Sequence, residues 1–182
     1  QPGTRRRLPS EEGITLALQF ANLLAMAHAK NIVYLDHKLE HVYWDGITLK
    51  VIDFNSSKQL GDGNNTMEFT RDIHSMCVGI LYSIFTGMSP QKTALRPQAG
   101  GIDIVENRYN DIHELDFMME PNLSQAMEAM LQRGAQQEIP TVQKFLAELQ
   151  EVAALHGRDF PSTYTSTANR QARDTLRKGL SM

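Results

Sequence analysis

A mainly α-helical domain with one small β-hairpin is the fold class that this sequence predicts. Two long apolar stretches, residues 14–29 and 73–87, have the length and composition of buried helices. Between them, Asp45-Gly46 separates two β-prone runs, and an Asp-Gly pair in that position is a strong hairpin signal. Shorter helical patterns follow, so helices should form most of the core.

The composition is that of an ordinary globular domain. The chain has 182 residues, of which 41% are hydrophobic and 21% are charged, which is enough to bury one core and argues against disorder. The formal net charge of -3 gives no general attraction for nucleic acid, and no apolar run has the length of a membrane span. The single cysteine, Cys77, excludes an intrachain disulfide and favours a reducing compartment, so we expect a cytoplasmic protein.

Three units are expected along the chain. Residues 1–9 form a basic N-terminal segment with three consecutive arginines. Residues 10–156 carry the helical and hairpin patterns and should form the folded domain. Residues 157–182 change to a polar and basic composition, which is typical of a tail.

The N-terminal half of the domain should contain one long helix and the hairpin. Ser10 has a side-chain oxygen that can cap a helix, and two acidic residues follow it. The helix should end near Ala29. A short strand-like run, 32–34, then leads through a polar loop into the hairpin at 42–54.

The C-terminal half should be helical. The second apolar helix should begin at Asp72 and end near Gly87, with Pro90 just beyond, which is the usual order at a helix end. The segments on either side, 55–70 and 91–110, are rich in loop-forming residues. The later helices are expected at 111–119, at 122–133 with Asn122 or Ser124 near the start, and at 140–155 with Pro140 in the first turn.

Several conspicuous residues are expected to serve packing. Tyr43 and Trp44 on the hairpin should belong to the core. Cys77 lies inside the second apolar helix and should be a small buried hydrophobe rather than a nucleophile. The pair Met118-Met119 fits either packing or an adaptable contact surface.

Two carboxylates flank the predicted hairpin. Asp36 precedes it, Asp53 follows its second strand, and Lys38 lies two residues after Asp36. A hairpin can bring both of its ends together, and two acids with a lysine could hold a divalent cation and a phosphate. The same residues are also ordinary turn formers and solvated side chains. The spacing alone leaves both interpretations open.

The order of these pieces resembles the C-terminal lobe of the eukaryotic-type Ser/Thr protein kinases. The stretch LLAMAHAKNIVYLDHKLEHVYWDGITLKVIDFN (23–55) is similar to helix E, the catalytic loop, the hairpin and the metal-binding loop of that family. The stretch RDIHSMCVGILYSIFTGMSP (71–90) is similar to its central helix F. The resemblance covers about residues 10–155 and rests on several motifs in the right order rather than on a single one.

The resemblance assigns a role to each matching residue. In YLDHKLEH (34–41), Asp36 matches the catalytic aspartate that accepts the substrate hydroxyl proton, and Lys38 matches the lysine that steadies the transferred phosphate. Asp53 matches the magnesium-binding aspartate of the family. Asp72 matches the aspartate of helix F, which ties the catalytic loop to that helix.

Four positions in these motifs depart from the family pattern. Tyr34 replaces a histidine, and Leu35 replaces the arginine that pairs with an activation-loop phosphate. His41 replaces the asparagine that binds the second metal, and an imidazole suits zinc or manganese better than magnesium. Asn55 replaces the glycine that ends the metal-binding motif. Asparagine tolerates a positive φ, so this turn should persist.

The segments that hold a peptide substrate and the nucleotide in the family are reduced or missing. Only residues 54–71 separate Asp53 from Asp72, without an A-P-E motif, and Ile139 stands about where the family has the arginine that pairs with its glutamate. A buried ion pair that lacks one partner is costly, so these two losses agree with each other. Residues 1–9 hold no glycine-rich loop. We therefore expect the N-terminal lobe to be absent from this chain.

Three functions remain open from the sequence. A degenerate kinase would act as a regulatory or scaffolding module for a protein partner, with an apolar surface where the second lobe would sit. The C-terminal lobe of an active Ser/Thr kinase, with its N-terminal lobe upstream of this chain, would use ATP with magnesium or manganese and transfer the γ-phosphate to a protein hydroxyl. An unrelated helical binding module would place Asp36 and Asp53 far apart. The residue His41 and the shortened segment favour the first.

Overall fold

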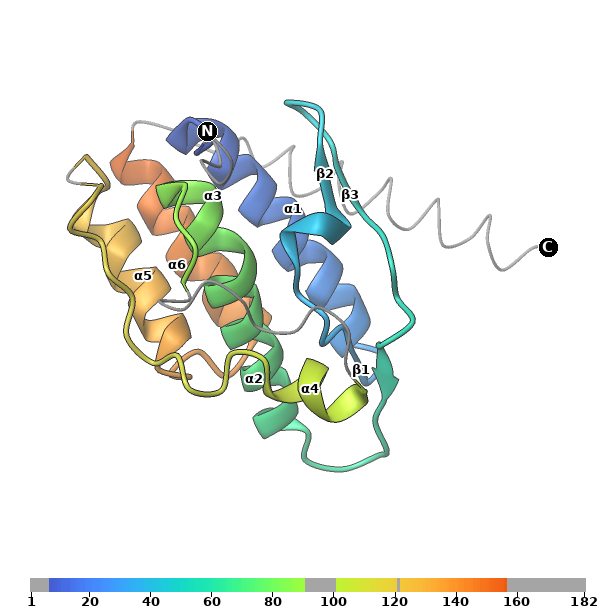
Figure 1. Cartoon of the computed structure of the whole chain (residues 1–182). Coiled ribbons are helices and arrows are strands. Elements are labelled where there is room, and N and C mark those ends of the chain that lie inside the picture. Colours follow the sequence, from blue (N-terminus) through green and yellow to red (C-terminus); the bar gives the residue numbers. More distant parts are fainter. Residues whose placement is uncertain (1–6, 91–100, 121, 157–182) are drawn as a thin grey trace.

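The computed structural model describes residues 7–90, 101–120 and 122–156. Helices form most of it, and a β-hairpin lies along one side of the first helix (Figure 1). The helices are α1 (Ser10–His28), the 3-10 turn η1 (Leu39–His41), α2 (Thr66–Met76), the π-helical turn η2 (Cys77–Leu81), α3 (Tyr82–Thr86), α4 (Ile102–Asn107), α5 (Gln125–Ala135) and α6 (Val142–Leu155). The strands are β1 (Ile32–Val33), β2 (Val42–Trp44), β3 (Leu49–Val51) and β4 (Lys58–Gln59). The expected mainly helical fold with a small β part is confirmed.

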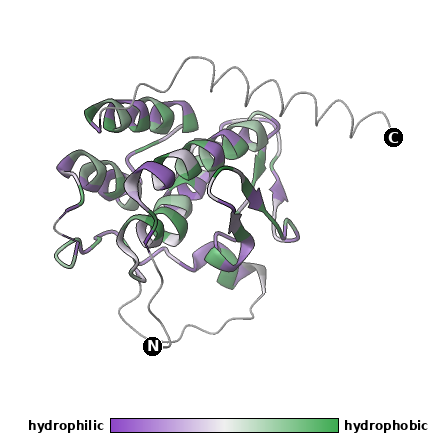
Figure 2. Cartoon of the chain, turned by 90° about the horizontal axis from the view of Figure 1, so that it is seen from above, coloured by the Kyte–Doolittle hydropathy of each residue, from purple (hydrophilic) through white to green (hydrophobic). Residues whose placement is uncertain are grey.

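The core lies between α1, the continuous stretch α2–η2–α3, α5 and α6. Helix α1 packs against α6, and α5 packs against both α6 and η2. Phe20, Ile80, Leu81 and Phe145 are fully buried where these helices meet. Hydrophobic and hydrophilic residues alternate around the helices, as expected for helices with one buried side (Figure 2). The two apolar stretches of the sequence therefore supply the centre of the molecule.

The β structure consists of two antiparallel pairs. In the predicted hairpin, Val42 pairs with Val51 and Trp44 with Leu49, and these side chains pack against the core. Tyr43 points the other way and is 56% exposed, so its expected place in the core is wrong, because neighbouring strand residues face opposite sides. The second pair joins β1 to β4, and β4 lies in a segment that was expected to be loop.

Three helix starts differ from the expectation. Ser10 is the first residue of α1 and gives no side-chain cap, since Pro9 occupies the cap position. Helix α2 begins at Thr66 rather than at Asp72, because the Asn64 side chain accepts a hydrogen bond from the Thr66 amide over 3.1 Å and so allows an earlier turn. Helix α6 is capped by Thr141, which leaves Pro140 before the helix.

The segment expected to be helical at 111–119 is irregular. The side chain of Gln132 on α5 accepts a hydrogen bond from the Leu115 amide over 3.0 Å and donates one to the His113 carbonyl over 2.8 Å. The Tyr82 hydroxyl donates to the Asp116 carbonyl over 2.5 Å. These contacts satisfy backbone groups of the segment 111–119 with side chains of the helical core. The segment therefore does not have to form helical turns to satisfy them.

The remaining expectations about helices are met in part. Helix α3 ends where Gly87 adopts a φ of 72°, as predicted. Helix α5 begins at Gln125 with Ser124 as its cap, and α4 lies in a segment that was expected to be loop. The basic residues 1–6, the segment 91–100 and the tail 157–182 lie outside the described residues. Within the described part, no helix combines the length and apolar character that crossing a membrane requires.

Candidate functional site

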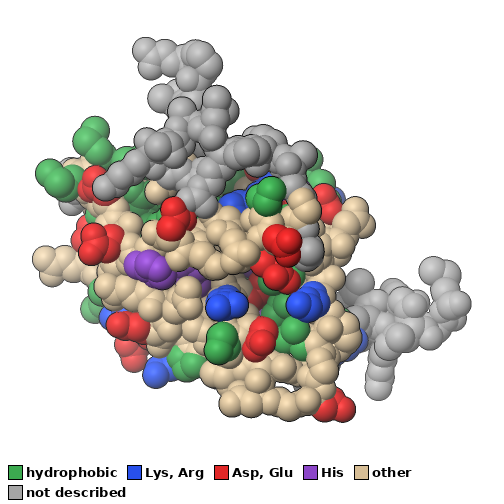
Figure 3. Space-filling model, turned by 60° about the horizontal axis from the view of Figure 1, so that its bottom comes forward, with side chains coloured by type: hydrophobic (Ala, Val, Ile, Leu, Met, Phe, Trp, Pro, Cys, Tyr) green, Lys and Arg blue, Asp and Glu red, His purple; other side chains and the backbone are tan. Residues whose placement is uncertain are grey.

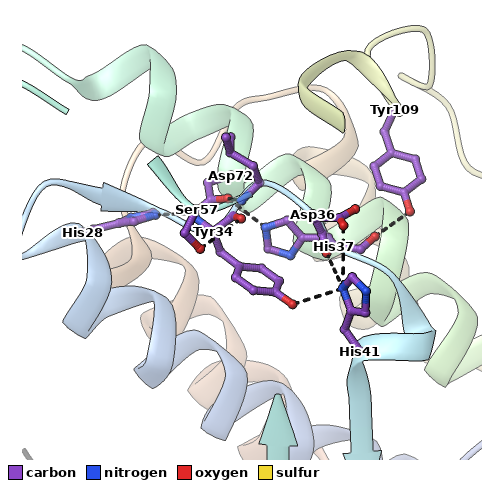
Figure 4. A network of polar contacts seen from close by, with 9 residues as sticks. His28, Tyr34, Asp36, His37, His41, Ser57, Asp72 and Tyr109 are labelled. Atoms are coloured by element: carbon purple, nitrogen blue, oxygen red, sulfur yellow. Dashed lines mark hydrogen bonds and ion pairs between the residues drawn. The ribbon is translucent and has the colours of Figure 1, made fainter. Parts of the chain in front are cut away.

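The loop that follows β1 is held by the carboxylate of Asp72. One oxygen of Asp72 accepts hydrogen bonds from the Tyr34 amide and from Nε2 of His28, over 3.0 and 2.8 Å. The other accepts from the Leu35 amide and from Nε2 of His37, over 3.0 and 2.8 Å (Figure 4). The structure thus contains the link between this loop and the second apolar helix that was expected of Asp72.

The buried negative charge of Asp72 is compensated by its hydrogen bonds and by its two imidazole neighbours. Burial alone would raise its pKa, but the electrostatic attraction of His37 and the hydrogen bonds from His28 and His37 outweigh burial and hold the pKa well below its ordinary value. A buried carboxylate that accepts four hydrogen bonds is rigidly oriented. The same contacts support Leu35, whose φ of 68° is unfavourable for a leucine.

Asp36, His41 and Asp53 come together at the end of the hairpin. Each offers one ligand atom, and these atoms lie within 4.8 Å of one another. The hairpin causes this meeting, because the Ile52 amide donates to the His41 carbonyl over 2.9 Å and so places Asp53 beside the start of β2. Nε2 of His41 lies 3.4 Å from Asp53. The two carboxylates that were expected to meet do meet.

The hydrogen bonds around His41 fix the orientation of its ring. The Tyr34 hydroxyl donates to the Ile52 carbonyl over 2.9 Å, so its proton is already used. Nδ1 of His41 therefore donates to the Asp36 carbonyl over 3.1 Å, with the Tyr34 oxygen 3.4 Å away (Figure 4). This leaves Nε2 toward the Asp53 carboxylate. A lone pair on Nε2 would repel that oxygen, so either a proton or a metal cation belongs between them.

Tyr34 acts in this site as a neutral donor. Burial, followed by the charges of Asp36, Asp53 and Asp72, raises the pKa of Tyr34 far above its ordinary value. Its ring also contacts Phe54 edge to face, at 5.3 Å between centroids. Tyr34 therefore connects the loop to the residues that follow β3.

Asp36 is surrounded by positive charge. Its side chain is 8% exposed, and Oδ1 lies 3.2 Å from Nη2 of Arg108 and 3.9 Å from Nζ of Lys38. Among the described residues, none makes a hydrogen bond to Oδ1. This oxygen is therefore an electron-pair ligand held inside the site and turned toward cations. Lys38 stands where the sequence placed it, beside Asp36.

Arg108 is the site residue that sequence reasoning missed. It follows α4, in a segment that was expected to be loop. Because it is far from Asp36 in the sequence, no local pattern indicates that the two residues meet. The neighbouring Tyr109 donates its hydroxyl proton to the His37 carbonyl over 2.6 Å (Figure 4), and burial raises the pKa of Tyr109 to about 12. This neighbour therefore fixes the backbone from which Arg108 extends.

The turn at Asp53 differs from the expectation. Asp53 itself adopts the positive φ, at 62°, and accepts a hydrogen bond from the Asn55 amide over 3.3 Å. Asn55 is not among the described residues with positive φ, so the reason given for the survival of this turn was wrong. Aspartate tolerates this backbone region better than most residues and can close a short turn with its own side chain.

The donor set fits a metal cation. Two carboxylates and one imidazole are suitable ligands for manganese or zinc, and less so for magnesium, which prefers oxygen. Acidic and basic side chains lie side by side on the face of the molecule that Figure 3 shows. The site could therefore hold a divalent cation at His41 and Asp53, with Asp36 as a third, charge-paired ligand.

The fold and the site together define a helical domain with a candidate metal centre at the end of a β-hairpin. No protein-family model matches this chain, and no curated protein matches it.

Proposed function

We propose that this chain is a degenerate protein-kinase-like lobe that acts as a regulatory or scaffolding module and binds a protein partner. The observation that carries the proposal is the state of Asp36. Its carboxylate is paired with Arg108 over 3.2 Å. Nearby, His41 stands where the kinase family has a metal-binding asparagine. A general base must accept a proton from a substrate hydroxyl, and an acid that is already paired with a guanidinium is poorly suited to that task.

Two further observations support the kinase-like part of the proposal. Asp72 ties the loop of Asp36 to α2 through the amides of Tyr34 and Leu35. Asp36 and Asp53 lie in one cluster. An unrelated helical binding module was expected to keep those two carboxylates apart. Their proximity therefore supports the kinase-like interpretation over that one.

Exposed apolar side chains on the hairpin support the proposal that the chain binds a protein partner. Tyr43 lies on the exposed side of β2, and Ile52 directly follows β3. Ile47 and Phe54 lie at the two ends of the hairpin. All four are at least 45% exposed. The charged Lys50 pairs with Tyr43 on this face. Exposed apolar side chains of this size are typical of surfaces that another protein covers.

The second candidate function is the lobe of an active Ser/Thr kinase, with ATP and magnesium or manganese. Asp36, Lys38 and Asp53 favour it, because these three residues stand around one site. This function would require Arg108 to leave Asp36 during the reaction. The two candidates therefore differ in whether nucleotide binds at the site together with the metal.

Thermal unfolding of the chain separates the two functions. We expect manganese alone to raise the melting temperature and millimolar ATP to add nothing, with or without magnesium. A ligand present at a hundredfold over its Kd would add roughly 2.7 kcal/mol, a shift of several degrees. Asp53→Ala should abolish the manganese shift, and Asp62→Ala, at an exposed acid outside the site, should not.

A magnesium-ATP shift that disappears in Asp53→Ala would support the active kinase and overturn the degenerate one. No shift with any metal would mean that the cluster is not a metal site.

A further inference from the structure

The positive charge at Asp36 comes from a distant part of the chain. Arg108 reaches Asp36 from the end of α4, and its side chain is 12% exposed. The guanidinium also interacts with the Tyr109 hydroxyl. It therefore has protein partners on two sides. A side chain held in this way is part of the site in the folded state and is not a mobile surface charge.

The backbone around Arg108 is anchored at several points. The Tyr109 hydroxyl binds the His37 carbonyl over 2.6 Å, and the Tyr109 carbonyl faces Nε2 of His74 over 3.0 Å. On the preceding turn, Glu106 pairs with Lys58 over 3.4 Å. These contacts connect α4 to the loop of Asp36, to α2 and to β4, and they fix the position of the guanidinium.

The positive charges around the site balance the negative charges of its two carboxylates. Asp36 and Asp53 supply two negative charges, and Arg108 and Lys38 supply two positive charges near Asp36. A divalent cation would thus meet little net negative charge. Its attraction to Asp36 is reduced by the repulsion of Arg108, which is strong for charges that are mostly buried and close together.

We propose that Arg108 is a resident cation of the site, which neutralises Asp36 and thereby sets the affinity for divalent metal. In the native chain, a single metal ion is held chiefly by His41 and Asp53. Without the guanidinium, Asp36 becomes a full third ligand and the same metal binds more tightly. This inference rests on the metal site of the proposed function and adds the residue that regulates it.

Titration of manganese into the full 182-residue chain, followed by calorimetry, tests the inference. Arg108→Gln removes the charge and keeps a polar side chain, and we expect it to tighten manganese binding by about tenfold. Arg108→Lys keeps a positive charge and should bind manganese about as the native chain does. Arg133→Gln is the matched control, because Arg133 makes a comparable ion pair with Glu148 away from the site, and its manganese affinity should be unchanged.

Each outcome decides the question. Equal or weaker manganese binding by Arg108→Gln, with normal binding by the native chain, would overturn the role of Arg108 and leave the metal site intact. The absence of manganese binding in both would overturn the role of Arg108 and the metal site together. If Arg108→Gln did not fold, Arg108→Met takes its place, because it also removes the charge and keeps an extended side chain. Manganese binding about tenfold tighter than in Arg108→Lys would then support the charge effect, and equal binding by the two variants would overturn it.

Discussion

The carboxylate of Asp72 accepts a hydrogen bond over 2.8 Å from the imidazole of His37, the residue that follows Asp36. Both side chains are buried. The position of Asp36 therefore depends on a buried contact made by its neighbour, in addition to the two amide contacts of the same loop. The stability of the fold and the geometry of the site share this carboxylate.

Loss of Asp72 should strongly destabilise the protein. Asp72→Ala would leave two imidazoles and two amides without their acceptor, and we expect the free energy of unfolding to fall by about 3–5 kcal/mol. Asp72→Asn keeps one acceptor oxygen and should cost less. Urea unfolding followed by circular dichroism measures both variants.

Ser83→Ala is the control for Asp72. Ser83 is also a buried polar side chain, on α3, but its hydroxyl has no hydrogen-bond partner in the described part of the chain, so its removal should change stability little. Equal effects of Asp72→Ala and Ser83→Ala would contradict the importance of this carboxylate.

A methyl group at Gly79 should disturb the contact between Tyr109, which follows α4, and the loop of Asp36. A Cβ at this position would lie 2.6 Å from the Tyr109 ring and 2.8 Å from the His37 carbonyl oxygen. Alanine normally favours a helix over glycine by roughly 0.5–1 kcal/mol, but overpacking of this kind costs typically 1–3 kcal/mol. We expect a lower melting temperature for Gly79→Ala. Gly61→Ala, where nothing lies within 4 Å, should be neutral, and stabilisation by Gly79→Ala would show that the close approach is not required.

The stability should depend on pH through His74. Burial lowers the pKa of His74 below its ordinary value of 6.5, against the opposing effect of three backbone carbonyls. The unfolded chain therefore takes up a proton more readily, and the free energy of unfolding should fall as the pH falls below about 6.5. Urea unfolding between pH 5 and 8 measures this, and His74→Gln should show a weaker dependence. An NMR titration that places the His74 pKa above 6.5 would refute the explanation.

Cys77 should be unreactive in the folded protein. Its thiol is fully buried, and burial raises its pKa far above the ordinary value. Since the chain has one cysteine, labelling with a thiol reagent reports on this residue alone. We expect no labelling of the native protein and complete labelling in denaturant. Rapid labelling under native conditions would mean that the stretch α2–η2–α3 opens or that the thiol is accessible.

The sequence was most informative where a local pattern decides the structure. The apolar runs predicted α1 and the stretch α2–η2–α3, and the Asp-Gly pair predicted the hairpin. Ser124 caps α5 as expected. The meeting of Asp36 with Asp53 followed from the hairpin, because pairing of its strands brings their ends together.

Contacts between distant segments were not visible in the sequence. Arg108 has no local pattern that connects it with Asp36, and the contact joins two segments that are far apart in the sequence. The irregular segment at 111–119 also results from a distant side chain, Gln132, which satisfies its backbone. Local propensity is overridden where tertiary contacts offer the backbone other partners.

The identity of the residue at position 41 should determine which metal the site prefers. Nε2 of His41 faces Asp53 over 3.4 Å, while Nδ1 donates to the Asp36 carbonyl. His41→Asn would replace this nitrogen with an amide oxygen, which is a better ligand for magnesium and a poorer one for zinc. We expect zinc affinity to fall by about tenfold or more and magnesium affinity to stay the same or rise.

Competition titrations with zinc and magnesium measure the two affinities, and His113→Asn is the control at an exposed histidine outside the cluster. His113→Asn should leave both affinities unchanged, because its ring takes no part in the site. An equal loss of zinc affinity in His41→Asn and His113→Asn would mean that zinc binds to surface histidines in general. Unchanged zinc affinity in His41→Asn would mean that the two carboxylates bind the metal without the imidazole.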